Sequence, residues 1–151
     1  MAMSDTIYAD FEVSAEELFL YYLNELEYSV SEHHPPTLVG DGYTVDIDNE
    51  FENMYAQEAC REHYGFSPTV SLYITWEKFF QGPTMYQRLS LPLLTLMNDF
   101  KGDMVYLTNG AVPDFLRSNQ KIYLDKRVIR QWGAVFDEFG IAYEVKTLPS
   151  L

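Results

Sequence analysis

The chain has 151 residues, 47% hydrophobic and 16% aromatic, and this length predicts one domain that buries about 68–70% of its unfolded surface. Its formal net charge of −13 opposes direct binding to nucleic acid or to anionic lipid, and no run of about 18 apolar residues indicates a membrane span. The single cysteine, Cys60, excludes an intramolecular disulfide. Together with a first segment that lacks signal-peptide features, it favours the cytoplasm.

The first elements are defined by two different periods of apolar residues. Ile7–Val13 alternates between apolar and polar positions, which predicts a half-buried strand. Ser14 and Glu17 then have the spacing of a capping box, in which Ser14 accepts a hydrogen bond from the Glu17 amide. Apolar residues follow at three- and four-residue steps as far as Leu26, so we expect an amphipathic helix of about three to four turns.

The next segment combines a loop, a strand and a weak helix. Ser29–Gly42 reads as a loop, because the prolines after two histidines oppose both helix and central strand. Tyr43–Asp48 alternates, with Tyr43 inward and Asp46 and Asp48 outward. Met54–Tyr64 has only a weak apolar stripe, which indicates a short helix.

A strong strand and a long helix follow. Thr69–Lys78 alternates β-branched and aromatic residues, as a pleated sheet surface favours. A helical stripe then extends from Tyr86 to Phe100. Because Pro92 lies inside this stripe, we expect either one helix kinked there or a second helix that begins near Pro92.

The region 101–126 predicts a three-stranded meander. Asn109-Gly110 is a strong hairpin signal, because both residues tolerate the positive φ of a type I′ turn. Met104–Thr108 precedes this turn, and two short strands, Asp114–Arg117 and Lys121–Leu124, follow it around a second turn at residues 118–120.

The chain ends with a helix and a strand. Asp125 caps a last helix that Gly140 ends, and Ile141–Lys146 alternates as a closing strand, with Val145 inward. The fold class is therefore α+β: a single domain over residues 1–151, with a mostly antiparallel sheet, about three helices packed on one face, and a meander in the C-terminal half.

Motifs for catalysis are absent from the sequence. There is no serine elbow, no phosphate-binding loop and no dinucleotide fingerprint. Cys60 and His63, with His33 and His34, are too irregularly spaced to predict zinc. The acidic run that begins at Asp46 departs from a calcium loop at its sixth and twelfth positions. We therefore expect a protein that is not an enzyme and needs no metal or cofactor.

The acidic residues are distributed unevenly. Residues 1–75 contain 15 acidic residues and one basic residue, a net of −14, whereas residues 76–151 contain 8 acidic and 9 basic residues, a net of +1. The segment 41–64 is rich in both acids and tyrosines. Its candidate partner-binding residues are Asp41, Tyr43, Asp46, Asp48, Glu50, Glu52, Tyr55, Glu58, Glu62 and Tyr64. Such a surface attracts basic partners. The alternative is a solvated acidic loop over a core strand with its aromatic residues buried.

Two longer phrases carry a resemblance to a known family. They are GFSPTVSLYITWEKF (Gly65–Phe79) and LMNDFKGDMVYLTNGAVPDFLRSNQKIYL (Leu96–Leu124). The positions that carry the likeness are Gly65, Pro68, Thr69, Val70, Gly102, Asp103, Val105, Leu107, Asn109, Gly110, Pro113, Leu116 and Arg117. In these phrases the chain resembles a bacterial polymorphic-toxin immunity family of the kind described from swarming-inhibition toxin systems.

The resemblance implies a binding function. A member of such a family binds and neutralises a cognate protein toxin by occluding its active site or an essential surface. The acidic first half would direct it to a basic toxin, such as a nuclease with a cationic substrate groove. Two alternatives stay open: a small enzyme using Cys60, His63 or carboxylates in an acidic, tyrosine-rich cleft near residues 41–64, and a regulatory module that binds a small cationic ligand there.

Overall fold

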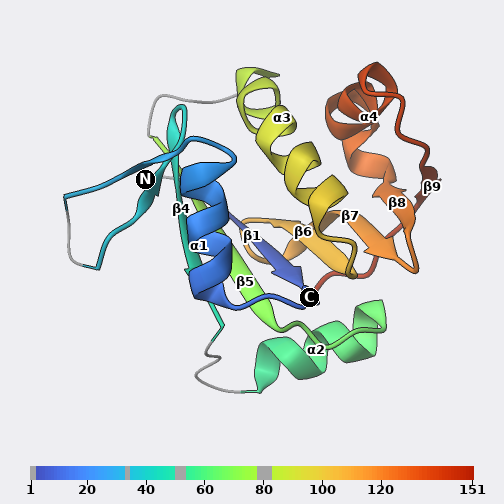
Figure 1. Ribbon diagram of the computed structural model, residues 1–151. Coiled ribbons are helices and arrows are strands. Elements are labelled where there is room, and N and C mark those ends of the chain that lie inside the picture. Colours follow the sequence, from blue (N-terminus) through green and yellow to red (C-terminus); the bar gives the residue numbers. More distant parts are fainter. Residues whose placement is uncertain (1–2, 33–34, 50–53, 78–82) are drawn as a thin grey trace.

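The described part of the chain forms one nine-stranded sheet at the centre of the molecule (Figure 1). The computed structural model describes residues 3–32, 35–49, 54–77 and 83–151. The strand order is β2-β3-β4-β5-β1-β6-β7-β8-β9, and every neighbouring pair is antiparallel except β8 and β9. The mixed, mostly antiparallel sheet with helices confirms the α+β fold class.

The strands fall into two halves that follow the sequence. The first half of the chain supplies β1 (Ser4–Ala9), β2 (Ser29–Val30), β3 (Leu38–Val39), β4 (Tyr43–Asp48) and β5 (Val70–Trp76). The second half supplies β6 (Met104–Thr108), β7 (Val112–Ser118), β8 (Lys121–Asp125) and β9 (Glu144–Lys146). Since β1 pairs with β6 in the middle, the two halves of the chain occupy opposite halves of the sheet.

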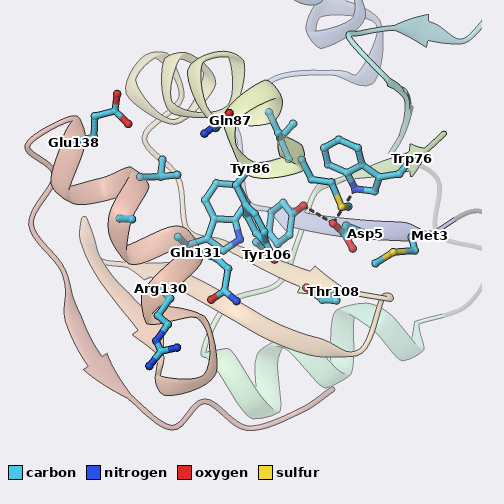
Figure 2. Close-up of a pocket in the computed structure, with 15 residues that line it drawn as sticks. Met3, Asp5, Trp76, Tyr86, Gln87, Tyr106, Thr108, Arg130, Gln131 and Glu138 are labelled. Carbon is cyan, nitrogen blue, oxygen red and sulfur yellow. Dashed lines mark hydrogen bonds between the residues drawn. The ribbon is translucent and has the colours of Figure 1, made fainter. Parts of the chain in front are cut away.

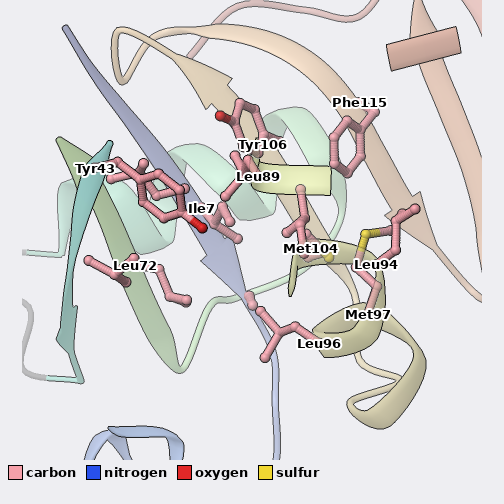
Figure 3. Close-up of a cluster of buried hydrophobic side chains, with 14 of the residues drawn as sticks. Ile7, Tyr43, Leu72, Leu89, Leu94, Leu96, Met97, Met104, Tyr106 and Phe115 are labelled. Carbon is pink, nitrogen blue, oxygen red and sulfur yellow. The ribbon is translucent and has the colours of Figure 1, made fainter. Parts of the chain in front are cut away.

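Three helical elements cover one face of the sheet, here called the front face. They are α1 (Ala15–Asn24), α3 (Pro83–Asp99) and a C-terminal helical segment that ends in α4 (Ala134–Glu138). Figure 3 shows the core that they form, in which Leu89, Leu96 and Met97 of α3 pack with strand residues such as Ile7 and Phe115. This front core contains most of the buried apolar side chains, which include both tryptophans.

The fourth helix, α2 (Tyr55–Tyr64), packs on the opposite, back face. Its buried residues Cys60 and Tyr64 form a second, smaller core with Tyr8, Val105 and Leu116. The three helices expected on one face are those of the front core, and α2 is a further helix on the other face. Strand β6 shows why cover is needed there, because its back-face residues Val105 and Leu107 are buried as fully as its front-face residues.

The meander is confirmed. Strands β6, β7 and β8 are consecutive antiparallel neighbours. Asn109 and Gly110 join the first two with φ values of 54° and 71°, and Asn119 and Gln120 join the last two with φ values of 51° and 69°. Both pairs lie in the left-handed region that primed hairpin turns require.

The N-terminal helix and the helix with the internal proline form largely as the sequence predicts. Ser14 caps α1 by accepting a hydrogen bond of 3.1 Å from the Glu17 amide, and the Ser14 hydroxyl in turn contacts the Glu17 carboxylate. Helix α3 continues through Pro92 as one element, which excludes a second helix beginning there.

The C-terminal helical segment begins with the expected cap but is not a single α-helix. Asp125 accepts a hydrogen bond from the Arg127 amide at 3.0 Å. The segment comprises a 3₁₀ turn (Lys126–Val128), a π-helical stretch (Ile129–Gly133) and α4.

Three strand expectations need correction. Strand β1 begins at Ser4 and ends at Ala9, rather than extending to Val13. Residues 29–42 are not only loop, because β2 and β3 add two short edge strands there. Strand β9 is shorter than Ile141–Lys146, and Val145 is 44% exposed because β9 pairs with a single neighbour at the edge of the sheet.

Candidate functional site

The acidic residues of β4 point away from the front core. Asp46 and Asp48 are exposed, while Tyr43 and Val45 are buried, as the alternation predicts. Asp46 accepts a hydrogen bond of 2.6 Å from the Thr37 hydroxyl. Because the register places Asp46 opposite Tyr73, and side chains alternate between faces, both acids lie on the back face, the same side as α2.

Helix α2 presents further polar residues on that side. Tyr55 is 67% exposed, and Glu58 and Glu62 are also exposed. Arg61, the only basic residue in the first half of the chain, donates from Nε to the Ser67 hydroxyl at 2.9 Å. The sequence and the fold therefore bring acids from β4 and α2 to one side of the molecule.

The remaining candidate residues have other positions. Tyr43 is 1% exposed and its hydroxyl shares a hydrogen bond with Tyr28 in the front core. Tyr64 is buried in the back core and donates to the Pro149 carbonyl at 2.6 Å. Asp41 forms an ion pair with Arg88 of α3. Glu50 and Glu52 lie outside the described residues.

Cys60 and His63 do not form a reactive pair. The Cys60 side chain is fully buried in the back core, and burial raises the pKa of its thiol to about 12, so that it is protonated at neutral pH. His63 is exposed. The described residues contain no cluster of three His, Cys, Asp or Glu side chains suited to a metal ion, and His33 and His34 lie outside them.

A hollow of about 550 Å³ lies at the opposite side of the molecule from α2 (Figure 2). It opens between α3 and the C-terminal helical segment, above the ends of β1, β5 and β6. Its lining includes four aromatic side chains, Trp76, Tyr86, Tyr106 and Trp132, and a buried acidic group, Asp5. The described residues of the segment 41–64 contribute nothing to this lining.

Asp5 was not among the residues that the sequence singled out. The residue is 5% exposed, and its Oδ2 accepts hydrogen bonds from Tyr106 Oη at 2.5 Å and Trp76 Nε1 at 3.1 Å. Oδ1 accepts from the Asn109 amide at 3.3 Å. A signal did exist, since extending the alternation of Ile7 and Ala9 back by two residues places Asp5 on the inward face.

A second buried acid, Asp114, lies nearby and has a cationic hydrogen-bond partner. Asp114 is 1% exposed and falls at a bulge of β7. Its Oδ1 accepts from Arg127 at 2.6 Å and from the Thr108 hydroxyl at 2.8 Å, and its Oδ2 accepts from Trp132 Nε1 at 2.9 Å. Burial raises the pKa of Asp114, while the hydrogen bonds and the charge of Arg127 oppose this rise. Asp114 therefore has its own cation within the fold.

Comparison of the chain with family models, with curated protein sequences and with solved structures gives no match. Among the described residues, no helix has the length and apolar character needed to cross a bilayer.

Proposed function

We propose that this protein is an immunity protein that binds a basic cognate toxin in the cytoplasm. The observation that carries the proposal is the gathering of exposed acids on the back side of the molecule, from two elements that are separate in sequence. We call this surface the acidic face and define it by Asp46, Asp48, Tyr55, Glu58 and Glu62.

Because the two halves of the chain occupy opposite halves of the sheet, the uneven charge along the sequence becomes an uneven charge distribution over the molecule. The first 75 residues, with a net charge of −14, build β2 to β5 and β1 and also α2, whereas the near-neutral second half builds β6 to β9. A charge separation of this kind orients an approaching cationic protein and raises association rates by about 10- to 10³-fold at low salt.

The acidic face also offers contact area. Tyr55 is 67% exposed, and Tyr73, which lies beside Asp46 in the sheet, is 38% exposed. Tyrosine is enriched at protein interfaces, because it supplies a large surface at a small cost in side-chain entropy. A toxin with a cationic groove would meet acids for steering and tyrosines for contact on the same surface.

The test combines neutralisation and kinetics. We expect the gene adjacent to that of this protein to encode a toxin, and co-expression of the chain to restore growth of cells that express the toxin domain. With the purified toxin domain, the Asp46→Lys and Asp48→Lys double variant should associate about tenfold more slowly at low salt. It should also show a weaker dependence of the on-rate on ionic strength.

The matched control reverses Glu25 and Glu27, two exposed acids that follow α1 near the front face. Each double reversal changes the net charge by the same amount, so the comparison separates position from total charge. Equal on-rates for both double variants would contradict a role for the acidic face. A toxin that the chain neither binds nor neutralises would contradict the proposed function itself.

A further inference from the structure

The hollow beside Asp5 contains a buried carboxylate that lacks a cationic partner among the described residues. Its three hydrogen-bond donors, Tyr106, Trp76 and the Asn109 amide, are all neutral. None of the ion pairs in the described part of the chain includes Asp5, whereas Asp114 in the same core is paired with Arg127. Buried charges are normally paired, so the environment of Asp5 is suited to a cation from outside.

The carboxylate also retains the capacity to accept a hydrogen bond. Oδ2 already accepts from two side chains, whereas within the described residues Oδ1 accepts only the long contact from Asn109. A carboxylate has about four acceptor positions. Oδ1 is therefore the atom at which an N–H donor of a ligand would bind.

The aromatic lining favours the same kind of ligand. Trp132 makes edge contacts with Tyr86 and Tyr106, with ring centroids 5.2 and 5.1 Å apart. Trp76 and Tyr106 both donate to Asp5 (Figure 2). The faces of aromatic rings attract cations, and Tyr86 is the partly exposed ring among them, whereas Trp76, Tyr106 and Trp132 are buried. The two ionisable side chains farther out, Arg130 and Glu138, have opposite charges and extend away from Asp5 in Figure 2.

We propose that this hollow binds a small organic cation, a primary ammonium or amidinium group attached to an apolar body. Its N–H group donates to Asp5 Oδ1, and its apolar body packs against Met3 and Tyr86, two lining side chains that are partly exposed. A volume of about 550 Å³ lies within the usual range of small-molecule sites, about 300–1,000 Å³. The site is independent of the acidic face, since the two share no residue.

The two tryptophans of the chain, Trp76 and Trp132, both line the hollow, so the tryptophan emission reports on it directly. We would titrate the protein with benzylamine and benzamidine as cationic probes, with benzyl alcohol as the neutral probe and with benzoate as the anionic probe. The cations should change the emission saturably and bind at least about tenfold more tightly than benzyl alcohol, the gain expected for a charge-assisted hydrogen bond. Benzoate should not bind.

Two variants test the location. Ala134 is exposed and lines the mouth of the hollow, so Ala134→Phe should block binding while the fold is retained. Ala142→Phe, at an exposed alanine outside the lining, is the control and should bind as the original chain does. Asp5→Asn should reduce the affinity for the cations to that for benzyl alcohol, with folding checked by circular dichroism.

Three results would overturn the proposal. They are cations that bind no better than benzyl alcohol, the absence of saturable binding by either cation, and unchanged binding by Ala134→Phe. The probe series and Ala134→Phe decide the question even where Asp5→Asn fails to fold.

Discussion

Cys60 illustrates how the surroundings of one residue determine its chemistry. The thiol lies on the buried side of α2, against the back of the sheet, and burial raises its pKa to about 12. At pH 8 about one molecule in ten thousand then carries the thiolate, compared with roughly a quarter for an ordinary cysteine of pKa about 8.5. The spacing of Cys60 and His63 left open a catalytic role for the thiol, and a buried, protonated thiol is a poor nucleophile.

We therefore predict that Cys60 reacts slowly in the native protein. Labelling by a thiol-specific disulfide reagent at pH 8 should be at least about a hundredfold slower in buffer than in denaturing urea, because both the thiolate fraction and access are low. The absorbance of the released thiol measures the rate. Native labelling as fast as that of the unfolded chain would place Cys60 on the surface.

Gly110 is the second residue whose role follows from local geometry. Its φ of 71° in the turn between β6 and β7 is accessible to glycine and strained for a β-branched side chain. Gly110→Val should lower the free energy of unfolding by roughly 1–3 kcal/mol, as measured by urea denaturation. The neighbouring Ala111→Val, at an exposed residue, should change it by less than about 0.5 kcal/mol. Equal effects at the two positions would indicate that the turn strain is absent.

At the scale of elements, Arg117 connects the meander to α3. Arg117 is 5% exposed, and its guanidinium group extends from β7 to the C-terminal end of α3. It donates to the Met97 carbonyl at 2.5 Å, to the Gly102 carbonyl at 2.7 and 2.9 Å, and to the Phe100 carbonyl. A cation at a helix C-terminus satisfies orphan carbonyls and interacts favourably with the helix dipole.

Removing this cap should destabilise the fold. Arg117→Met keeps most of the apolar volume but leaves buried carbonyls without donors, and should cost about 2–4 kcal/mol. Lys121→Met, which removes an exposed partner of Glu144, serves as the control and should cost less than about 1 kcal/mol. Chemical denaturation measures both. A small effect at Arg117 would mean that water replaces the guanidinium at the helix end.

The elements that the sequence predicted well are those whose apolar pattern matches their burial. Strand β4 has the expected bounds and alternation, and Tyr55–Tyr64 forms a helix close to that expected. The pattern fails where burial follows from tertiary contacts. Asp5 is polar, so the start of β1 was missed, although two aromatic donors allow its burial. Two-residue strands such as β2 are too short for a period to be seen.

The candidate functional residues were likewise predictable only where a local pattern determines their position. Outward positions of Asp46 and Asp48 follow from alternation within one strand, and they were predicted. The hollow at Asp5 requires α3, the C-terminal helical segment and three strands to converge, and these elements are distant in sequence. No local pattern contains this information, because it depends on β1 pairing with both β5 and β6.

At the scale of the whole molecule, the excess of negative charge determines the response to pH. The formal net charge is −13, and like charges in a compact state repel one another. Burial raises the pKa of Asp10, and the neighbouring Asp103 and Glu12 raise it further; burial also raises the pKa of Asp114. At the alkaline end, burial raises the pKa of Tyr8 and of Tyr43 to about 12.

These shifts have one sign, and they predict how stability changes with pH. A carboxyl or phenol whose pKa is raised by folding holds its proton more tightly in the native than in the unfolded chain, so that stability falls as pH rises through the window between the two values. The window of the two carboxyls begins at their ordinary pKa of 3.8, so the melting temperature should rise as pH is lowered from about 6 toward 4. The window of the two tyrosines lies between 10 and about 12, so the melting temperature should fall steeply there. Calorimetry at about pH 4, 6, 9 and 11 measures this profile. Asp10→Asn should reduce the gain between about pH 6 and 4 more than Asp46→Asn, which removes the same charge from the acidic face. A melting temperature that falls on acidification would mean that the native carboxylates are stabilised by partners, and that repulsion among them is not the dominant effect.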